Sequence, residues 1–125
     1  WKAKCSSLEN TNIPPSVLII RGAAFRGCTS LKSIEIPSSV TNVGDYLFQN
    51  CTSLTGIKFL ASVDKIGVCT FMNCQSLETI EIPASVTFIG YNSFYICKSL
   101  KCIMVHSNIN LKNTGINSDV TVKLI

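Results

Sequence analysis

Cysteine is the residue type with the most chemistry to offer in this 125-residue chain, which contains seven of them. Five share one spacing of 23 residues: Cys5, Cys28, Cys51, Cys74 and Cys97. Even spacing indicates a repeated structural position, where cysteine behaves as a small buried hydrophobic residue. Strands about 4.8 Å apart would suit the Cα separation of a disulfide, but their parallel Cβ directions oppose its torsion angle. We therefore expect free thiols, which fit a reducing compartment and oxygen-poor surroundings equally well.

The two remaining cysteines, Cys69 and Cys102, lie outside this series. Each is separated by four intervening residues from a cysteine of the series, in the pairs Cys69–Cys74 and Cys97–Cys102. A zinc site would need both partners to point at one ion, whereas the series cysteines are expected to point inward. An odd total also leaves at least one thiol unpaired in any scheme. We expect no metal and no cofactor.

Acid–base catalysis would have to involve His106, the single histidine. Its position corresponds to one where other parts of the chain carry proline, and only Glu78 and Glu81 are expected near it. Glu35 and Glu81 should stand roughly 10 Å apart with Lys58 between them, which favours two ionised carboxylates rather than an acid–base pair. The chain also lacks a glycine-rich phosphate loop. The sequence therefore predicts a protein that is not an enzyme.

Composition excludes several other classes. The chain is 46% hydrophobic and 14% charged, which suits one domain with a sizeable core. Its formal net charge of +4 is scattered, so nucleic-acid binding is not expected. No apolar run approaches the roughly 18 to 20 residues that span a bilayer, so membrane insertion is not expected either. No secretory signal is visible at the first residues.

The elements that must position these residues follow from an internal repeat. The phrases "IEIPSSVTNVGDYLF" (34–48) and "IEIPASVTFIGYNSF" (80–94) are two periods apart, and "IKFLASVDKIGVCTF" (57–71) is the altered copy between them. The phenylalanines keep the same 23-residue step as the cysteines: Phe25, Phe48, Phe71 and Phe94. Repeats of this length indicate a solenoid, in which each unit buries its apolar side chains against its neighbours.

Each unit predicts a short path around one coil. The alternation of Ile34, Glu35 and Ile36 is typical of a half-buried strand, and Pro37 ends it because proline has no N–H for the ladder. Val40 and Val43 then predict a second extended segment on the opposite wall. We expect Gly44 to permit a positive φ and the stretch before the next cysteine to return as one helical or 3₁₀ turn. The predicted fold is thus a β-rich solenoid of the α/β type, with short parallel strands on one face and short extended or 3₁₀ segments on the other.

The unit CxxLxxIxIPxxVxxIGxxxF resembles the BspA-like, or Treponema-type, class of leucine-rich repeat, from about Cys5 to Val105. The resemblance implies a non-enzymatic surface protein with adhesive or host-contact roles. Departures from the pattern are Leu60 in place of proline, Arg21 in place of glycine, and Lys2 where a phenylalanine would precede Cys5. Trp1 is a candidate to fill that last gap.

The units divide the chain into one leucine-rich repeat domain spanning 1–125. Their expected bounds are 5–27, 28–50, 51–73, 74–96 and 97–109, followed by a C-terminal cap over 110–125. Val120, Val122 and Leu124 alternate in that cap as a final strand. The N-terminal edge has no comparable cap, so its unpaired strand could receive another copy of the chain.

The exposed face of the parallel sheet is the predicted protein-binding surface. Its expected residues form two columns across the strands, one of Glu35, Lys58, Glu81 and Met104 and the other of Lys32, Glu78 and Lys101. Alternating charges also make a solubilising ladder worth about 0.2 to 1 kcal/mol per pair. This face has no aromatic anchor, so a single domain should bind weakly. Two functions stay open: a protein-binding module, and a structural unit that joins head to tail into oligomers or fibres.

Overall fold

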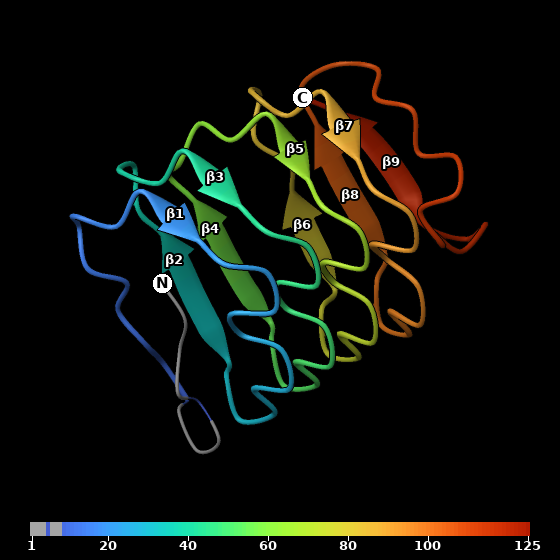
Figure 1. The fold of residues 1–125 in the computed structure, drawn as a ribbon. Helices are drawn as coiled ribbons and strands as arrows, with labels where there is room; N and C mark the ends of the chain where they lie inside the picture. Colours follow the sequence, from blue (N-terminus) through green and yellow to red (C-terminus); the bar gives the residue numbers. More distant parts are fainter. Residues whose placement is uncertain (1–4, 6–8) are drawn as a thin grey trace.

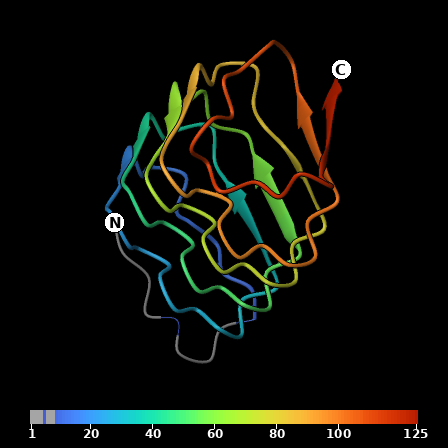
Figure 2. The same cartoon turned by 90° about the vertical axis from the view of Figure 1, so that its right-hand side faces the viewer.

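The computed structural model describes Cys5 and residues 9–125, which wind into about five coils. The longer strands line one wall of the coils and the two-residue strands line the opposite wall (Figures 1 and 2). The longer strands form what we call the long-strand face: β2 (Ser33–Ile36), β4 (Gly56–Phe59), β6 (Thr79–Glu81), β8 (Cys102–Val105) and β9 (Thr121–Leu124). The short-strand face consists of β1 (Ile19–Ile20), β3 (Asn42–Val43), β5 (Lys65–Ile66) and β7 (Phe88–Ile89).

Neighbouring coils pair in parallel with a register of one repeat. Ser33 lies beside Gly56 in β2 and β4, and Ile19 lies beside Asn42 in β1 and β3, both 23 residues apart. The predicted solenoid of 23-residue coils is confirmed. Pro37 follows the last residue of β2, whereas Leu60 donates its amide to the Ile36 carbonyl at 2.8 Å. Replacing proline with leucine thus extends the ladder by one hydrogen bond.

The return stretch of each coil is a succession of tight turns, and no helix is assigned anywhere in the described part of the chain. This corrects the expected helical or 3₁₀ turn. Each return stretch has two residues with positive φ, which interrupt a helical path. They form two columns, the first of Ala23, Tyr46, Cys69 and Asn92 and the second of Gly27, Asn50, Asn73 and Ile96.

The predicted role of the repeat glycines was wrong. Within the described residues, positive φ among glycines occurs at Gly27 and Gly115, so Gly44, Gly67 and Gly90 do not need glycine for that reason. They need it for space, because a Cβ on Gly90 would lie 2.7 Å from the carbonyl carbon of Gly67. Ser93 reinforces this approach, because its one hydroxyl proton is shared between the Gly67 carbonyl oxygen at 2.8 Å and the Gly90 carbonyl oxygen at 2.7 Å.

Ile96 has the most strained backbone conformation of the second positive-φ column, because it is a β-branched residue with a φ of 60°. A β-branched residue is strained there, whereas asparagine, as at Asn50 and Asn73, tolerates it. We expect Ile96→Asn to stabilise the protein by about 1 kcal/mol, because relief of backbone strain exceeds the loss of a partly exposed side chain. Urea unfolding measures the change. Ile19→Asn, at an exposed strand position, should give no gain, and an equal gain there would contradict this explanation.

The core is a set of stacked columns between the two walls. The four phenylalanine rings stack in sequence order with centroids 5.4, 5.6 and 5.7 Å apart. Cys28, Cys51, Cys74 and Cys97 form a buried column beside them. The interior therefore repeats one set of contacts from coil to coil, as expected of a solenoid.

The long-strand face is not one continuous sheet. Strands β2 and β4 form one sheet, and β6, β8 and β9 form another. The short-strand face is divided as well, into β1–β3 and β5–β7. Both interruptions border the third coil, which is the altered copy of the repeat.

At the C-terminal end, β9 pairs in parallel with β8, so the predicted final strand is present. Its side chains Val122 and Leu124 are 46% and 60% exposed. At the other end, the interpretation of Trp1 and Lys2 lies outside the described residues. The unit bounds and the role of 110–125 as a cap stay predictions.

Candidate protein-binding surface

The first predicted column lies along the long-strand face. Glu35 pairs with Lys58 across β2 and β4, and Glu81 pairs with Met104 across β6 and β8. Glu35, Lys58 and Glu81 are exposed and Met104 is half-buried. The sheet interruption separates Lys58 from Glu81, so the column is two pairs rather than one ladder.

The second predicted column consists of Lys32, Glu78 and Lys101, all exposed. Lys32 Nζ lies 3.6 Å from Glu9 Oε1 in a solvent-exposed ion pair. His106 Nε2 lies 3.3 Å from Glu81 Oε2, a contact that is an ion pair only when the imidazole is protonated. Glu35 and Lys58 are therefore neighbours without an ion pair, and the charges stay available to a partner.

A shallow trough runs over the first strands of this face. It has a volume of about 490 Å³ and is bordered by the small side chains of Asn10, Ser33 and Gly56 on one side and by Asn12, Glu35 and Lys58 on the other. Ser33 donates to Asn10 Oδ1 at 2.6 Å, which orders this border. The small residues create the hollow because they leave space beside the longer charged side chains.

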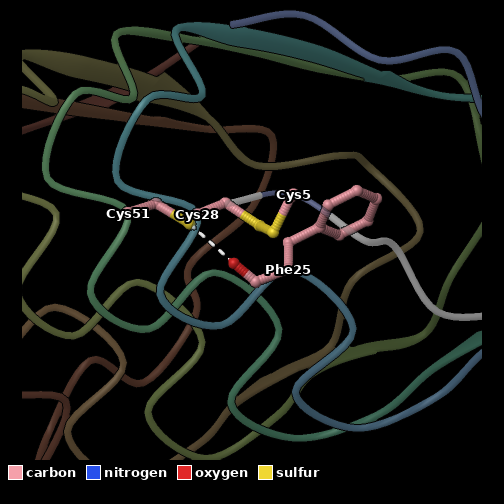
Figure 3. Close-up of a disulfide and its surroundings, with 4 residues drawn as sticks. All are labelled: Cys5, Phe25, Cys28 and Cys51. Atoms are coloured by element: carbon pink, nitrogen blue, oxygen red, sulfur yellow. Dashed lines mark hydrogen bonds between the residues drawn. A yellow bond between two sulfur atoms is a disulfide. The ribbon is translucent and has the colours of Figure 1, made fainter. Parts of the chain in front are cut away.

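The expectation that all five series cysteines are free thiols was wrong for the first pair. Cys5 and Cys28 form a disulfide, with Cα atoms 5.2 Å apart (Figure 3). On the long-strand face near this end, strand pairing between the first two coils is reduced to an isolated bridge between Asn10 and Ser33.

The inner series cysteines are free and buried. Each thiol donates to the carbonyl of a phenylalanine 26 residues earlier, as Cys51 Sγ does to Phe25 O at 3.0 Å (Figure 3). Cys74 and Cys97 make the same contact with Phe48 and Phe71 at 3.2 and 3.0 Å. Burial raises the pKa of Cys51 to about 12 and that of Cys97 to about 11, and burial next to two other thiols raises the pKa of Cys74 further.

These environments predict selective thiol chemistry. At pH 8 we expect iodoacetamide to alkylate the half-buried Cys102 and to leave Cys51, Cys74 and Cys97 unmodified, because a buried thiol with a raised pKa forms little thiolate. Peptide mapping by mass spectrometry reads each site. Adding urea should expose the three inner thiols, and Cys5 and Cys28 should react only after reduction. Rapid native alkylation of Cys74 would contradict the buried column.

The described residues contain no group of three or more histidine, cysteine, aspartate or glutamate side chains arranged to hold a metal ion. His106 contacts the Glu81 carboxylate, and both side chains are exposed on the sheet face. Among the described residues, no serine or cysteine nucleophile makes a hydrogen bond to this pair.

Sequence reasoning missed an aromatic surface at the other wall. Phe88 on β7 and Tyr91 beyond it are 59% and 62% exposed. With Asn110, Lys112 and Asn113 they line a hollow of about 270 Å³. The signal was available, since Phe88 occupies the position that Asn42 and Lys65 occupy in earlier coils.

The parallel coils, the 23-residue register and the polar sheet face define a leucine-rich repeat protein. The BspA type leucine rich repeat region model matches residues 3–120 with six copies. The chain belongs to this family, and the resemblance inferred from its motif is confirmed.

Solved bacterial structures share the fold. A leucine rich cell surface protein from Faecalibacterium prausnitzii A2-165 has a TM-score of 0.82 and 30% identity over 93% of this chain and 32% of its own. Leucine-rich repeat proteins from Bacteroides ovatus and Bacteroides capillosus have TM-scores of 0.61 and 0.69 and identities of 34% and 26%. These alignments cover 75% of this chain and 33% of the first protein, and 81% of this chain and 79% of the second.

This chain thus spans about a third of the F. prausnitzii and B. ovatus proteins. A comparison with curated proteins gave no match. Within the described residues, no helix has the length and apolar character needed to cross a bilayer. The family and its solved relatives are repeat proteins rather than enzymes, and such folds commonly bind proteins or act at surfaces.

Proposed function

We propose that this chain is a non-enzymatic protein-binding module whose long-strand face contacts the partner. The observation that carries the proposal is the trough beside Glu35 and Lys58, where exposed charges of both signs flank a hollow of about 490 Å³. Solenoids commonly use such extended faces for binding. Adhesion or scaffolding would follow if several such surfaces acted together, because a face without aromatic anchors binds weakly at each site.

Charge reversal tests this surface. The combined variant Glu35→Lys, Lys58→Glu and Glu81→Lys should lower partner capture at least tenfold in a pull-down, while changing stability by less than about 1 kcal/mol because these side chains are exposed. The matched control is Phe88→Ala with Tyr91→Ala on the short-strand face. Capture that survives the reversal but is lost in the control would assign binding to the aromatic hollow instead.

A structural unit that self-associates head to tail is the second candidate. The observation in its favour is β9, which pairs with β8 on one side and has its apolar Val122 and Leu124 about half exposed. Such an edge can template another strand. The N-terminal edge that would meet it includes residues outside the described part of the chain.

Size-exclusion chromatography over a range of concentrations separates the two functions. Head-to-tail association predicts an apparent mass that rises with concentration and falls back in a Val122→Lys, Leu124→Lys variant. A constant monomer mass at the highest concentration would remove the second candidate and leave the binding module.

A further inference from the structure

The third and fourth coils separate on the long-strand face while remaining joined elsewhere. No hydrogen bond joins β4 to β6 among the described residues, and the two strands diverge in Figure 1. On the opposite wall, β5 and β7 pair in parallel. The return stretches are joined as well, since the Phe71 amide donates to the Ser93 carbonyl at 2.8 Å. The two coils therefore enclose a wedge that opens between β4 and β6.

The sequence of the third coil explains the wedge. Phe59 stands where the neighbouring coils carry Ile36 and Ile82, and it is half-buried whereas both isoleucines are fully buried. A larger side chain at a position sized for isoleucine forces its surroundings apart. The Leu60 amide holds the end of β4 against β2 through the Ile36 carbonyl. β4 is thus tied to the coil before it and separated from the coil after it.

Backbone groups of both strands point into the wedge. Gly56 and Leu60 donate their amides toward β2, at 3.1 and 2.8 Å, so the intervening Ile57 and Phe59 direct their N–H and C=O groups toward β6. On the other side, Ile82 donates to Met104 of β8 at 2.8 Å, so Glu81 directs its groups toward β4. Two strand edges therefore face each other without a ladder between them.

Two hollows are lined mainly by residues of the third and fourth coils beside the wedge. One of about 210 Å³ is lined by Ile57, Lys58, Phe59, Glu81 and Pro83. The other, of about 450 Å³, is lined by polar residues: Thr55, Ser76, Glu78, Thr79 and Ser99. The smaller hollow offers apolar contact with Ile57, Phe59 and Pro83. Opposite charges border it, Lys58 on β4 and Glu81 on β6.

We propose that the wedge widens to bind an extended polypeptide segment, which adds as a strand to the free edges of β4 and β6. An extended peptide presents N–H and C=O groups at the spacing of a β-strand. These groups are the hydrogen-bond partners that the two strand edges lack. An apolar side chain of the segment occupies the smaller hollow, and flanking charged residues meet Lys58 and Glu81. This inference names the partner chemistry for the protein-binding face and so rests on the proposed function.

Amide hydrogen exchange of the free protein tests the wedge itself. We expect the amides of Ile57, Phe59, Thr79 and Glu81 to exchange at least tenfold faster than those of Gly56, Leu60 and Ile82, which donate to neighbouring strands. Equal protection in the two groups would overturn the inference, because it would show that β4 and β6 are paired in solution.

Binding is tested with a synthetic peptide copying residues 31–39, LKSIEIPSS, which contains the strand that already pairs with β4. At millimolar concentration it should slow exchange of the four wedge amides at least tenfold. The same peptide with alternate backbone nitrogens methylated should lose this effect, since it cannot complete the ladder. Protection confined to β9, or equal protection by the methylated peptide, would overturn the proposal.

Phe59→Ile is the matched variant, because isoleucine is the residue of neighbouring coils. We expect it to fold, to protect the wedge amides without peptide and to abolish the peptide effect. Glu35→Lys, which lies outside the wedge, should weaken partner capture without altering peptide protection. Loss of capture in Glu35→Lys with unchanged peptide protection would support both proposals, whereas absent peptide protection with normal charge-sensitive capture would overturn the wedge alone.

Discussion

Replacing Phe71 with alanine is expected to lower the free energy of unfolding by about 3 to 5 kcal/mol. Its ring is fully buried and stacks between Phe48 and Phe94, with centroids 5.6 and 5.7 Å away. The substitution removes the apolar contact and leaves a cavity in the middle of the column, where coils on both sides hold the backbone apart. Urea unfolding followed by circular dichroism measures the loss.

Phe88→Ala is the control for that substitution, since it removes the same side chain from a position that is 59% exposed. We expect it to cost less than about 1 kcal/mol, because little apolar surface leaves a buried environment. A loss at Phe71 no larger than at Phe88 would mean that the phenylalanine column does not hold the coils together.

Replacing Gly90 with alanine is expected to cost about 3 kcal/mol, the upper end of the usual cost of overpacking. The added Cβ would lie 2.7 Å from both the Gly67 carbonyl carbon and the Val68 nitrogen, and these are backbone atoms that no rotamer change can move. The fourth coil would have to shift away from the third, which would strain the Ser93 contacts with both glycine carbonyls. Thermal unfolding or urea titration reports the change.

Gly56→Ala separates this effect from the general effect of removing a glycine. Its Cβ would meet Ser33 Cβ at 3.5 Å, an ordinary contact, and its φ is not positive. We expect a change within about 0.5 kcal/mol, with the sign favouring stability because alanine reduces the freedom of the unfolded chain. Similar losses at Gly90 and Gly56 would contradict the close approach of the coils.

The repeat made the fold predictable because each feature recurs in phase. The alternation around Glu35 predicted strand β2, and Pro37 correctly marked its end. The physical reason why glycine recurs at positions 44, 67 and 90 was not predictable in the same way. A recurring glycine is compatible with either a positive φ or a lack of space for a side chain. Only the spacing between coils decides between those causes.

The sequence predicted which residues form the two columns of the candidate surface, but it did not predict the break in the sheet that divides the first column. The sequence places Lys58 and Glu81 in the same column, whereas the break between β4 and β6 depends on how the bulk of Phe59 is accommodated. The Cys5–Cys28 disulfide was missed because its formation depends on the orientation of one end coil. A repeat pattern describes only what the coils have in common, so it does not report such a local difference. The exposed Phe88 was overlooked although its position in the repeat marks it as solvent-facing.

The central claim is that identical coils lie one upon another in register, and the sulfur atoms provide its most direct test. Anomalous X-ray scattering from a crystal locates sulfurs without reference to any model of the chain. The structure predicts that the sulfurs of Cys5, Cys28, Cys51, Cys74 and Cys97 lie in one row in sequence order, with the first two bonded. Five sulfurs dispersed through the molecule would contradict the stacked-coil structure.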